Sequence, residues 1–220
     1  RKAEELIKDG KVKVNGEVIT ELGTKVSESD KVEVNNKPIE KETKEYYLLN
    51  KPRGVITTTN DEHGRKTVTD LIETSARIYP VGRLDYDTTG AILLTNDGEF
   101  ANILMHPSNK IDKVYLAKLE GIIKGEQINA LKNGIMLDDV LVKASRVKLK
   151  KVNQENSTSM VEITIHEGKN RQIRKMCESI GKKVLALHRC KIGTLDVKDL
   201  KLGQWRYLTQ KEIEKFYGSK

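Results

Sequence analysis

The sequence is poor in the features that mark secreted, disulfide-rich and membrane-spanning proteins. It has only two cysteines among 220 residues, Cys177 and Cys190, and they form neither a Cys-x-x-Cys pair nor a metal-ligand spacing. No apolar run approaches the length of a membrane span, and no signal peptide opens the chain. These absences favour a soluble cytoplasmic protein whose two cysteines are reduced.

Charge is the first feature that the sequence has in excess. Forty Lys and Arg against 32 Asp and Glu give a formal net charge of +8. The excess lies late in the chain, because residues 169–191 hold eight basic residues and one acidic residue, whereas residues 1–40 hold eight and nine. Such an excess favours a polyanionic partner through electrostatic steering and counterion release.

Residues 1–40 have the pattern of a small separate unit. Their first ten residues place apolar side chains on one helical face, and Gly10 is positioned to end that helix. The segment KVKVNGEVI alternates apolar and polar residues around Asn15 and Gly16, which predicts a β-hairpin. A unit of this size buries little area alone. Because Arg1 already lies inside a helical pattern, we expect that N-terminal residues are missing.

Residues 41–45 are charged and without periodicity, so we interpret them as a linker to a larger domain, residues 46–220. In that domain strand patterns outnumber helical ones and do not alternate regularly with them. This favours an α+β fold, with a largely antiparallel central sheet flanked by helices, over a doubly wound α/β fold. Helices are predicted at the segments EFANILM, GEQINALKNG, NRQIRKMCESIG and TQKEIEKF, and a short one at TVTDLIE.

The helix expected over residues 170–180 is amphipathic, with its apolar residues spaced i, i+3, i+4 and i+7. Arg171, Arg174 and Lys175 fall on the opposite face, in the first turns, where the helix end itself carries partial positive charge. One interpretation is a solvated face. The other is an anion site, in which arginines and backbone donors bind a phosphate or a buried carboxylate.

The segment VGRLDYDTTG places the carboxylate of Asp85 on a short loop between apolar runs. Arg83 precedes it by two residues, so in an extended segment both side chains point the same way. Asp85 is either a turn residue or a nucleophile that a nearby arginine keeps ionised. No Ser/His/Asp set or Cys/His pair suggests itself elsewhere, which favours the nucleophile. Asp87 is expected to support the turn.

Four segments resemble the motifs of one family, in the family's order. GRLDYDTTGAILLTNDG resembles the signature of ribosomal RNA pseudouridine synthases of the RsuA/RluB type, and NKPRGVITT, KVYLAKLEG and EGKNRQIRKMCESIG are similar to its other motifs. Together they span about residues 46–210. Residues 1–40 resemble an S4 RNA-binding domain that lacks its first helix. The resemblance implies a pseudouridine synthase fold that follows a truncated S4-like domain.

The resemblance also implies a role for each matched residue. Asp85 would be the nucleophile, attacking either C6 of the uracil ring or C1′ of the ribose. Tyr115 would stack on the target base and assist proton removal from C5, and Arg174 would pair with Asp85. Arg83 would fill the gap left by the extruded uridine, and Leu187 would pack against the uracil. Phosphate contacts are expected from the late basic residues Lys169, Arg171 and Lys175.

The implied reaction detaches a uracil, rotates it and rejoins it through carbon. Because it exchanges no electrons and consumes no group donor, no metal and no other cofactor is expected, and the sequence has no Walker-type glycine loop. The expected partner is a stem-loop of ribosomal RNA, from which the target base must be extruded. We expect a monomer that does not associate with membranes.

The substrate and two competing hypotheses stay open at this stage. The segments DEHGRKTVTDLI and ANILMHPS look closer to the branch of the family that modifies large-subunit RNA, with small-subunit RNA as the alternative. A non-catalytic RNA-binding or ribosome-assembly protein would be expected to have lost Asp85, Tyr115 or Arg174, and all three are present. A nucleic-acid hydrolase would need a metal-binding acid cluster, for which Asp138 and Asp139 are a poor candidate.

Overall fold

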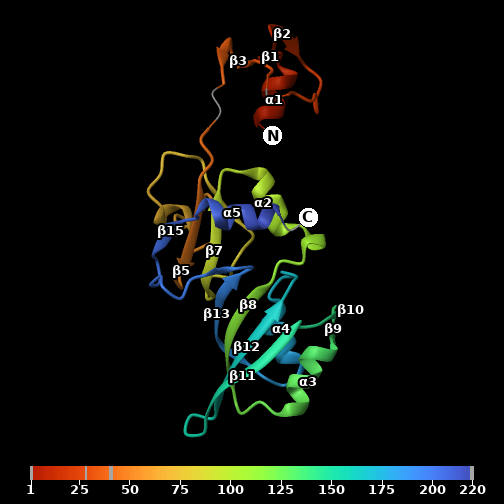
Figure 1. Cartoon of the computed structure of the whole chain (residues 1–220), viewed down its shortest axis with the longest axis vertical. Coiled ribbons are helices and arrows are strands. Elements are labelled where there is room, and N and C mark those ends of the chain that lie inside the picture. The colour runs from red at the N-terminus through yellow and green to blue at the C-terminus, as the bar shows by residue number, and fades with distance from the viewer. Residues whose placement is uncertain (1, 28, 40–41, 219–220) are drawn as a thin grey trace. The chain divides into compact units, whose positions relative to one another are not determined.

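The computed structural model describes residues 2–27, 29–39 and 42–218 (Figure 1). The chain divides into two compact units, Arg1–Thr43 and Lys44–Lys220, and each has its own sheet. The linker predicted at residues 41–45 spans this division. Four residues at the ends of the predicted domains and linker lie outside the described ranges: Arg1, Glu40, Lys41 and Lys220.

The first unit pairs one helix with a four-stranded antiparallel sheet. The hairpin predicted around Asn15 and Gly16 is present, and both residues have positive φ (51° and 88°), as a two-residue type I′ turn requires. None of the described residues of this unit is buried, so it has only a thin apolar core. Its elements are α1 (Lys2–Lys8), β1 (Val12–Val14), β2 (Glu17–Ile19), β3 (Val32–Val34) and β4 (Lys37–Pro38), in the sheet order β2-β1-β3-β4.

The second unit is built on one large sheet, in which β11, β12, β8, β13, β7, β5 and β15 follow one another (Figure 1). Every pairing along this path is antiparallel except that of β13 with β7, which confirms a largely antiparallel central sheet. The strands on this path are β5 (Tyr46–Lys51), β7 (Thr89–Thr95), β8 (Lys113–Glu120), β11 (Arg146–Asn153), β12 (Thr158–Ile165), β13 (Val184–Ile192) and β15 (Trp205–Tyr207).

Shorter elements complete this unit. The final helix has the Thr-x-x-Glu capping box, since Thr209 Oγ1 accepts from the Glu212 amide and the Glu212 carboxylate accepts from the Thr209 amide. The segment TVTDLIE, predicted as a short helix, forms only a 3₁₀ turn. No helix among the described residues is long and apolar enough to cross a membrane. These elements are η1 (Thr69–Leu71), β6 (Tyr79–Val81), α2 (Gly98–Met105), η2 (Pro107–Asn109), α3 (Gly125–Asn133), β9 (Ile135–Leu137), β10 (Val140–Val142), α4 (Gln172–Ser179), β14 (Leu195–Asp196) and α5 (Gln210–Tyr217).

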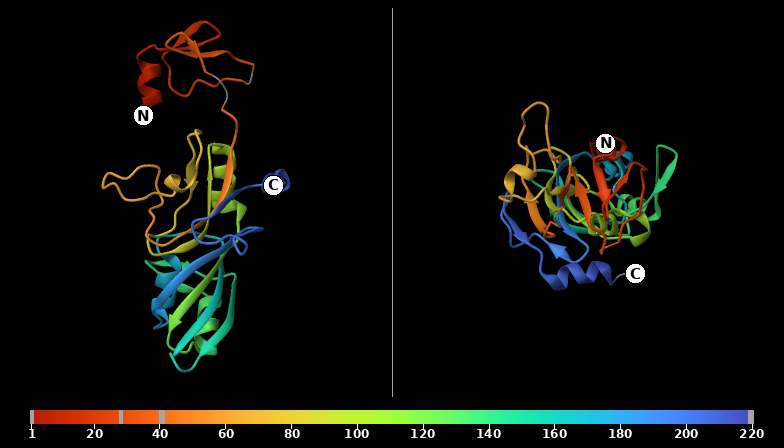
Figure 2. Two further views of the ribbon diagram at one scale, coloured as in Figure 1. Left: turned by 90° about the vertical axis from the view of Figure 1, so that its left-hand side faces the viewer. Right: turned by 90° about the horizontal axis from the view of Figure 1, so that it is seen from above.

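Two apolar clusters hold the sheet from its two faces. On one face α2 and α5 pack side by side over β5 and β7, where the ring of Phe100 makes edge contacts with Tyr46 and Phe216 (Figure 1). On the other face a larger cluster joins the loops after β5 to α4 and the inner residues of β8, β12 and β13. The loop after β5, orange in Figure 2, projects away from this sheet.

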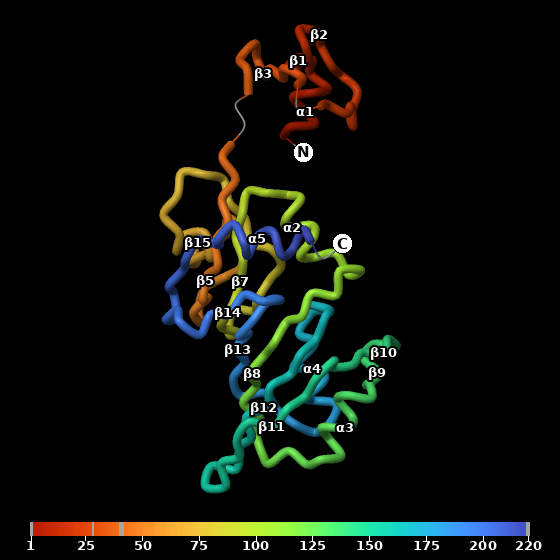
Figure 3. Tube along the Cα trace, in the orientation of Figure 1, coloured from red at the N-terminus to blue at the C-terminus, as the bar shows by residue number. Residues whose placement is uncertain are grey.

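The junction of β13 and β7 positions the functional site. These strands pair in parallel over only two positions, His188 with Thr89 and Arg189 with Gly90. A Cβ on Gly90 would lie 2.2 Å from the Arg189 carbonyl oxygen, and its φ is +112°, so only glycine fits there. The sheet divides at this junction into β5, β7 and β15 on one side and β8, β11 and β12 on the other (Figure 3).

Candidate active site

Asp85 lies in the loop that joins β6 to β7, and the backbone of this loop is fixed on both sides. Thr57 Oγ1 donates to the Leu84 carbonyl (2.8 Å) and accepts from the Leu84 amide (3.2 Å). The Thr88 amide donates to the carbonyl of Asp85 itself, at 3.0 Å. The Asp85 side chain stays 38% exposed, so a fixed loop presents a carboxylate that a ligand can reach.

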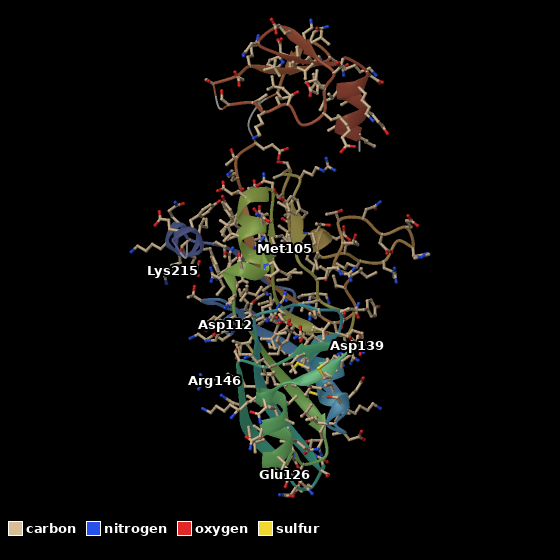
Figure 4. All side chains as sticks on the ribbon, turned by 90° about the vertical axis from the view of Figure 1, so that its right-hand side faces the viewer. Met105, Asp112, Glu126, Asp139, Arg146 and Lys215 are labelled. Carbon is tan, nitrogen blue, oxygen red and sulfur yellow. The ribbon has the colours of Figure 1, made fainter. Side chains whose placement is uncertain are left out.

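A pocket of about 690 Å³ opens at this loop. Its walls come from the Asp85 loop, β8, the end of β12, the start of α4 and β13, and Met105 at the end of α2 lines it as well (Figure 4). Of the eight predicted site residues, six line the pocket: Arg83, Asp85, Tyr115, Lys169, Arg171 and Leu187. The tertiary structure thus brings together residues from four separate sequence segments.

Tyr115 forms one wall of the pocket together with an arginine that the sequence analysis did not assign to the site. Tyr115 on β8 is 7% exposed and stands opposite Arg189 on β13. Arg189 Nη1 donates to the Tyr115 hydroxyl at 3.4 Å, and its guanidinium carbon lies 5.9 Å from the ring centroid. Arg189 Nε donates to the Ala91 carbonyl, whereas its buried Nη2 has no hydrogen-bond partner among the described residues. Only the strand register, which sequence patterns do not give, places Arg189 here.

The predicted pair of Arg174 with Asp85 is wrong. Arg174 Nη2 lies 2.9 Å from Asp87 Oδ2, and Asp85 instead faces Arg171, with 3.5 Å between Arg171 Nη1 and Asp85 Oδ2. Of the two interpretations of this helix face, a solvated face is wrong for Arg174, because it is 6% exposed and its Nη1 donates to the Val184 carbonyl. Arg171 precedes α4 and has a φ of +50°. Its side chain therefore does not follow the helical spacing from which the arginine positions were predicted.

Lys175 follows on the same helix and lies outside the pocket lining. It pairs with Asp138 at 2.6 Å, in the turn of the β9–β10 hairpin that also contains Asp139 (Figure 4). Its contact with RNA stays a prediction. Within the described part of the chain, no three His, Cys, Asp or Glu side chains are grouped to hold a metal ion, at this turn or elsewhere.

Lys51 is the second buried cation that the sequence analysis did not assign. It ends β5, is fully buried, and its ammonium donates to the carbonyls of Pro52, Asp85 and Thr88 at 3.1, 3.1 and 2.9 Å. Burial lowers the pKa of Lys51 to about 8, against the opposing effect of the Asp85 and Asp87 carboxylates. Its only sequence signal is a lysine that directly follows an apolar strand in the NKPRG segment.

The lining of the pocket itself is also cationic. Lys113 at the start of β8 donates to the His166 carbonyl at 2.8 Å, and burial lowers the pKa of its ammonium, with Arg189 lowering it further. With Lys169 and Arg171 it surrounds the pocket with positive charge, while the interior offers the Tyr115 ring and the Leu187 side chain. A flat apolar base attached to a phosphate backbone fits this combination, and the Asp85 carboxylate lines the same pocket.

The fold and this site define an RNA-modifying enzyme of the pseudouridine synthase class, and comparison with known proteins assigns the family. A family model described as RNA pseudouridylate synthase matches residues 45–179, and an S4 domain model matches residues 1–32. The chain belongs to the RNA pseudouridine synthase family and carries an S4 domain at its N-terminal end. The resemblance seen in the sequence is therefore confirmed, as are the fold class and the enzyme class.

The chain is also similar to individual members of this family. The chain is 51% identical to ribosomal large subunit pseudouridine synthase B of Bacillus subtilis, over 98% of this chain and 88% of the relative. It is 36% identical to the dual-specificity RNA pseudouridine synthase RluF of Escherichia coli, over 97% of this chain and 72% of the relative. A crystal structure of a pseudouridylate synthase superposes with a TM-score of 0.72 at 31% identity and covers 98% of this chain and 92% of the other.

Proposed function

We propose that this enzyme converts a specific uridine of large-subunit ribosomal RNA to pseudouridine, with Asp85 as the nucleophile. The substrate assignment is supported by 51% identity, along nearly the whole chain, to a relative named for that RNA. The role of Asp85 is supported by one observation above the others. Its carboxylate lines a pocket walled by Tyr115 and Leu187, on a loop whose backbone is fixed by Thr57 and Thr88, whereas the other acid of the lining, Glu167, precedes α4.

The pocket residues divide the reaction between them. The target base must leave its stack, and this unstacking costs a few kcal/mol. The ring of Tyr115 and the side chain of Leu187 hold the base, and Arg83, exposed at the mouth, fills the space it leaves in the RNA. Stacking on an aromatic ring contributes on the order of 1–3 kcal/mol and offsets much of the loss.

Asp85 then attacks C6 of the uracil or C1′ of the ribose. In either route the N1–C1′ bond breaks, the base rotates and a C5–C1′ bond forms. The bond between Asp85 and the attacked carbon breaks and restores the free carboxylate, the C5 proton leaves with the assistance of Tyr115, and N1 takes up a proton. Atoms and electrons balance without an oxidant or a group donor, so the chemistry calls for no cofactor. Arg174 and Asp87 act beside the nucleophile, since their ion pair holds α4 against the Asp85 loop.

We further propose that the enzyme works as a monomer on an RNA stem-loop in the cytoplasm. One chain supplies every residue of the pocket described above, which supports a monomer. RNA stem-loops present splayed bases that a protein can extrude, which supports this form of substrate. The late basic segment and the S4 domain supply phosphate contacts for the surrounding RNA.

The test is turnover on large- and small-subunit RNA fragments from a strain that lacks the modification, with pseudouridine mapped by chemical labelling. Asp85→Asn is expected to bind RNA like the wild type and to form no product. Asp138→Asn is the matched control, because Asp138 is an exposed, ion-paired aspartate outside the pocket. Turnover by Asp85→Asn near the wild-type rate would refute the nucleophile, and product only in small-subunit RNA would refute the substrate.

A further inference from the structure

The residue that follows Asp85 in the chain is an exposed aromatic. Tyr86 is 56% exposed, and within the described part of the chain its ring makes no aromatic contact and its hydroxyl no hydrogen bond. The other strongly exposed aromatic, Tyr207, packs on Tyr47 at a centroid distance of 4.8 Å and on Trp205 at 5.5 Å. Packing on these two rings explains why Tyr207 is aromatic. No ring contact among the described residues explains why Tyr86 is.

Tyr86 is nevertheless held in place. Its carbonyl accepts from the Gly54 amide at 3.0 Å, and Gly54 has a φ of +80° in the turn that follows β5. A Cβ on Gly54 would lie 3.7 Å from the Tyr86 hydroxyl, so the ring lies beside this turn. A ring fixed in this way loses little further freedom when it binds a ligand.

The position of Tyr86 relative to the pocket suggests its ligand. Asp85 lines the pocket and Tyr86 does not, since Tyr86 is a central residue of the turn that the Thr88 amide and the Asp85 carbonyl close. Arg53 and Arg83, next in the chain to Gly54 and Leu84, are exposed and have no ion-pair partner among the described residues. Aromatic rings interleaved with cations are the surface on which single-stranded RNA bases stack.

We propose that Tyr86 is a stacking platform for the base next to the target uridine in the substrate RNA. This inference rests on the proposed function and extends it to a neighbouring nucleotide. While the uridine enters the pocket toward Asp85, the adjacent base, which has lost its stacking partner, lies on the Tyr86 ring outside. The enzyme thereby restores part of the stacking that extrusion removes and fixes the strand on both sides of the reacting bond.

Kinetics on a stem-loop substrate test the ring itself. Because the platform binds ground and transition state alike, Tyr86→Ala is expected to raise KM about 5- to 30-fold with little change in kcat, and Tyr86→Phe to restore the wild-type KM. Leu202→Ala is the matched control, since Leu202 is 57% exposed on the same unit and lies outside the pocket. An unchanged KM in Tyr86→Ala, or a fall in kcat alone, would overturn the proposal.

A substrate series identifies the base. One substrate has an abasic site on the 5′ side of the target uridine, and a second has it on the 3′ side. With one of these two substrates, the KM of the wild type is expected to rise by the factor that Tyr86→Ala causes on intact RNA. With that same substrate, Tyr86→Ala is expected to cause no further rise in KM. If Tyr86→Ala acts equally on the intact and both abasic substrates, no flanking base stacks on the ring and the proposal fails.

A binding measurement separates this proposal from the proposed function. 2-Aminopurine beside the target is expected to be quenched by Asp85→Asn protein, which binds without turnover, and not by the double variant Asp85→Asn/Tyr86→Ala. If the wild type makes no pseudouridine, the proposed function fails while this quenching still decides about Tyr86. Equal quenching by both variants would refute the platform.

Discussion

The guanidinium of Arg174 lies 2.9 Å from the carboxylate of Asp87, two residues beyond Asp85, while Asp85 itself faces Arg171. The two pairs differ in environment. Arg174 has a side chain that is 8% exposed, whereas Arg171 is 46% exposed. A buried arginine fixes structure, whereas an exposed one can leave its partner for a ligand. We therefore expect Arg174 to hold α4 on the loop and Arg171 to bind RNA.

Truncation of the buried arginine should therefore destabilise the enzyme. Arg174→Ala is expected to lower the free energy of unfolding by about 3 kcal/mol, since it removes a buried side chain that pairs with Asp87 and donates to the Val184 carbonyl. Arg171→Ala should cost less than about 1 kcal/mol, as exposed pairs do. Urea denaturation measures both, and equal losses would contradict the assignment.

Arg171 should contribute instead to the salt dependence of RNA binding. For Arg171→Ala, the slope of log Kd against log salt concentration is expected to fall by about one, the change for one lost phosphate contact. Lys150→Ala is the matched control, since Lys150 also forms an exposed ion pair, with Glu162 on the neighbouring strand, outside the pocket. A slope that does not change in Arg171→Ala would remove this residue from the RNA footprint.

The hydroxyl of Tyr115 should matter for chemistry and its ring for binding. Tyr115→Phe keeps the ring and is expected to lower kcat about 100-fold with KM nearly unchanged, the effect of removing a group that assists proton transfer. Single-turnover kinetics on the stem-loop measure this step directly. A wild-type rate in Tyr115→Phe would restrict Tyr115 to stacking.

Lys51 should make stability depend on pH in the alkaline range. Its pKa is lowered to about 8 in the folded protein from an ordinary value of 10.5, so between these values the unfolded chain binds more protons than the folded one. The contribution of Lys51 to stability is therefore expected to rise between pH 8 and about 10, by no more than about 3 kcal/mol.

The comparison variant for this effect is Lys51→Met, in which this pH dependence should be absent. The variant should also be less stable at all pH values, because three buried carbonyls lose their donor. Urea denaturation between pH 7 and pH 9.5 measures both effects. Parallel stability curves for the variant and the wild type would show that Lys51 does not titrate there.

Gly90 should tolerate no side chain. Gly90→Ala is expected to cost more than about 3 kcal/mol, because the new Cβ meets the Arg189 backbone and the φ of +112° is unfavourable for alanine. Gly125→Ala is the control, since a Cβ at the start of α3 meets no atom within 4 Å. Thermal unfolding of both variants measures their stability relative to the wild type. A Gly90→Ala protein as stable as the wild type would show that the β7–β13 junction can open.

The sequence by itself determined everything that depends on local patterns. Alternation and turn residues predicted the strands and the Asn15-Gly16 hairpin, and the Thr-x-x-Glu segment predicted the cap of the last helix. The resemblance of its motifs to a known family implied that Asp85, Tyr115 and Leu187 share one site, and the structure brings all three to one pocket. The strand, turn and cap patterns each depend on residues that are close together in the chain.

Only the tertiary structure decided which charges meet. Arg171 and Arg174 are three residues apart, and the left-handed backbone at Arg171 determines which of them faces Asp85. The site contacts of Lys51 and Arg189 depend on where β5 and β13 pair with their neighbours, and strand register joins residues about a hundred positions apart. The physical reason is that burying a cation requires partners from several elements, which no local pattern contains.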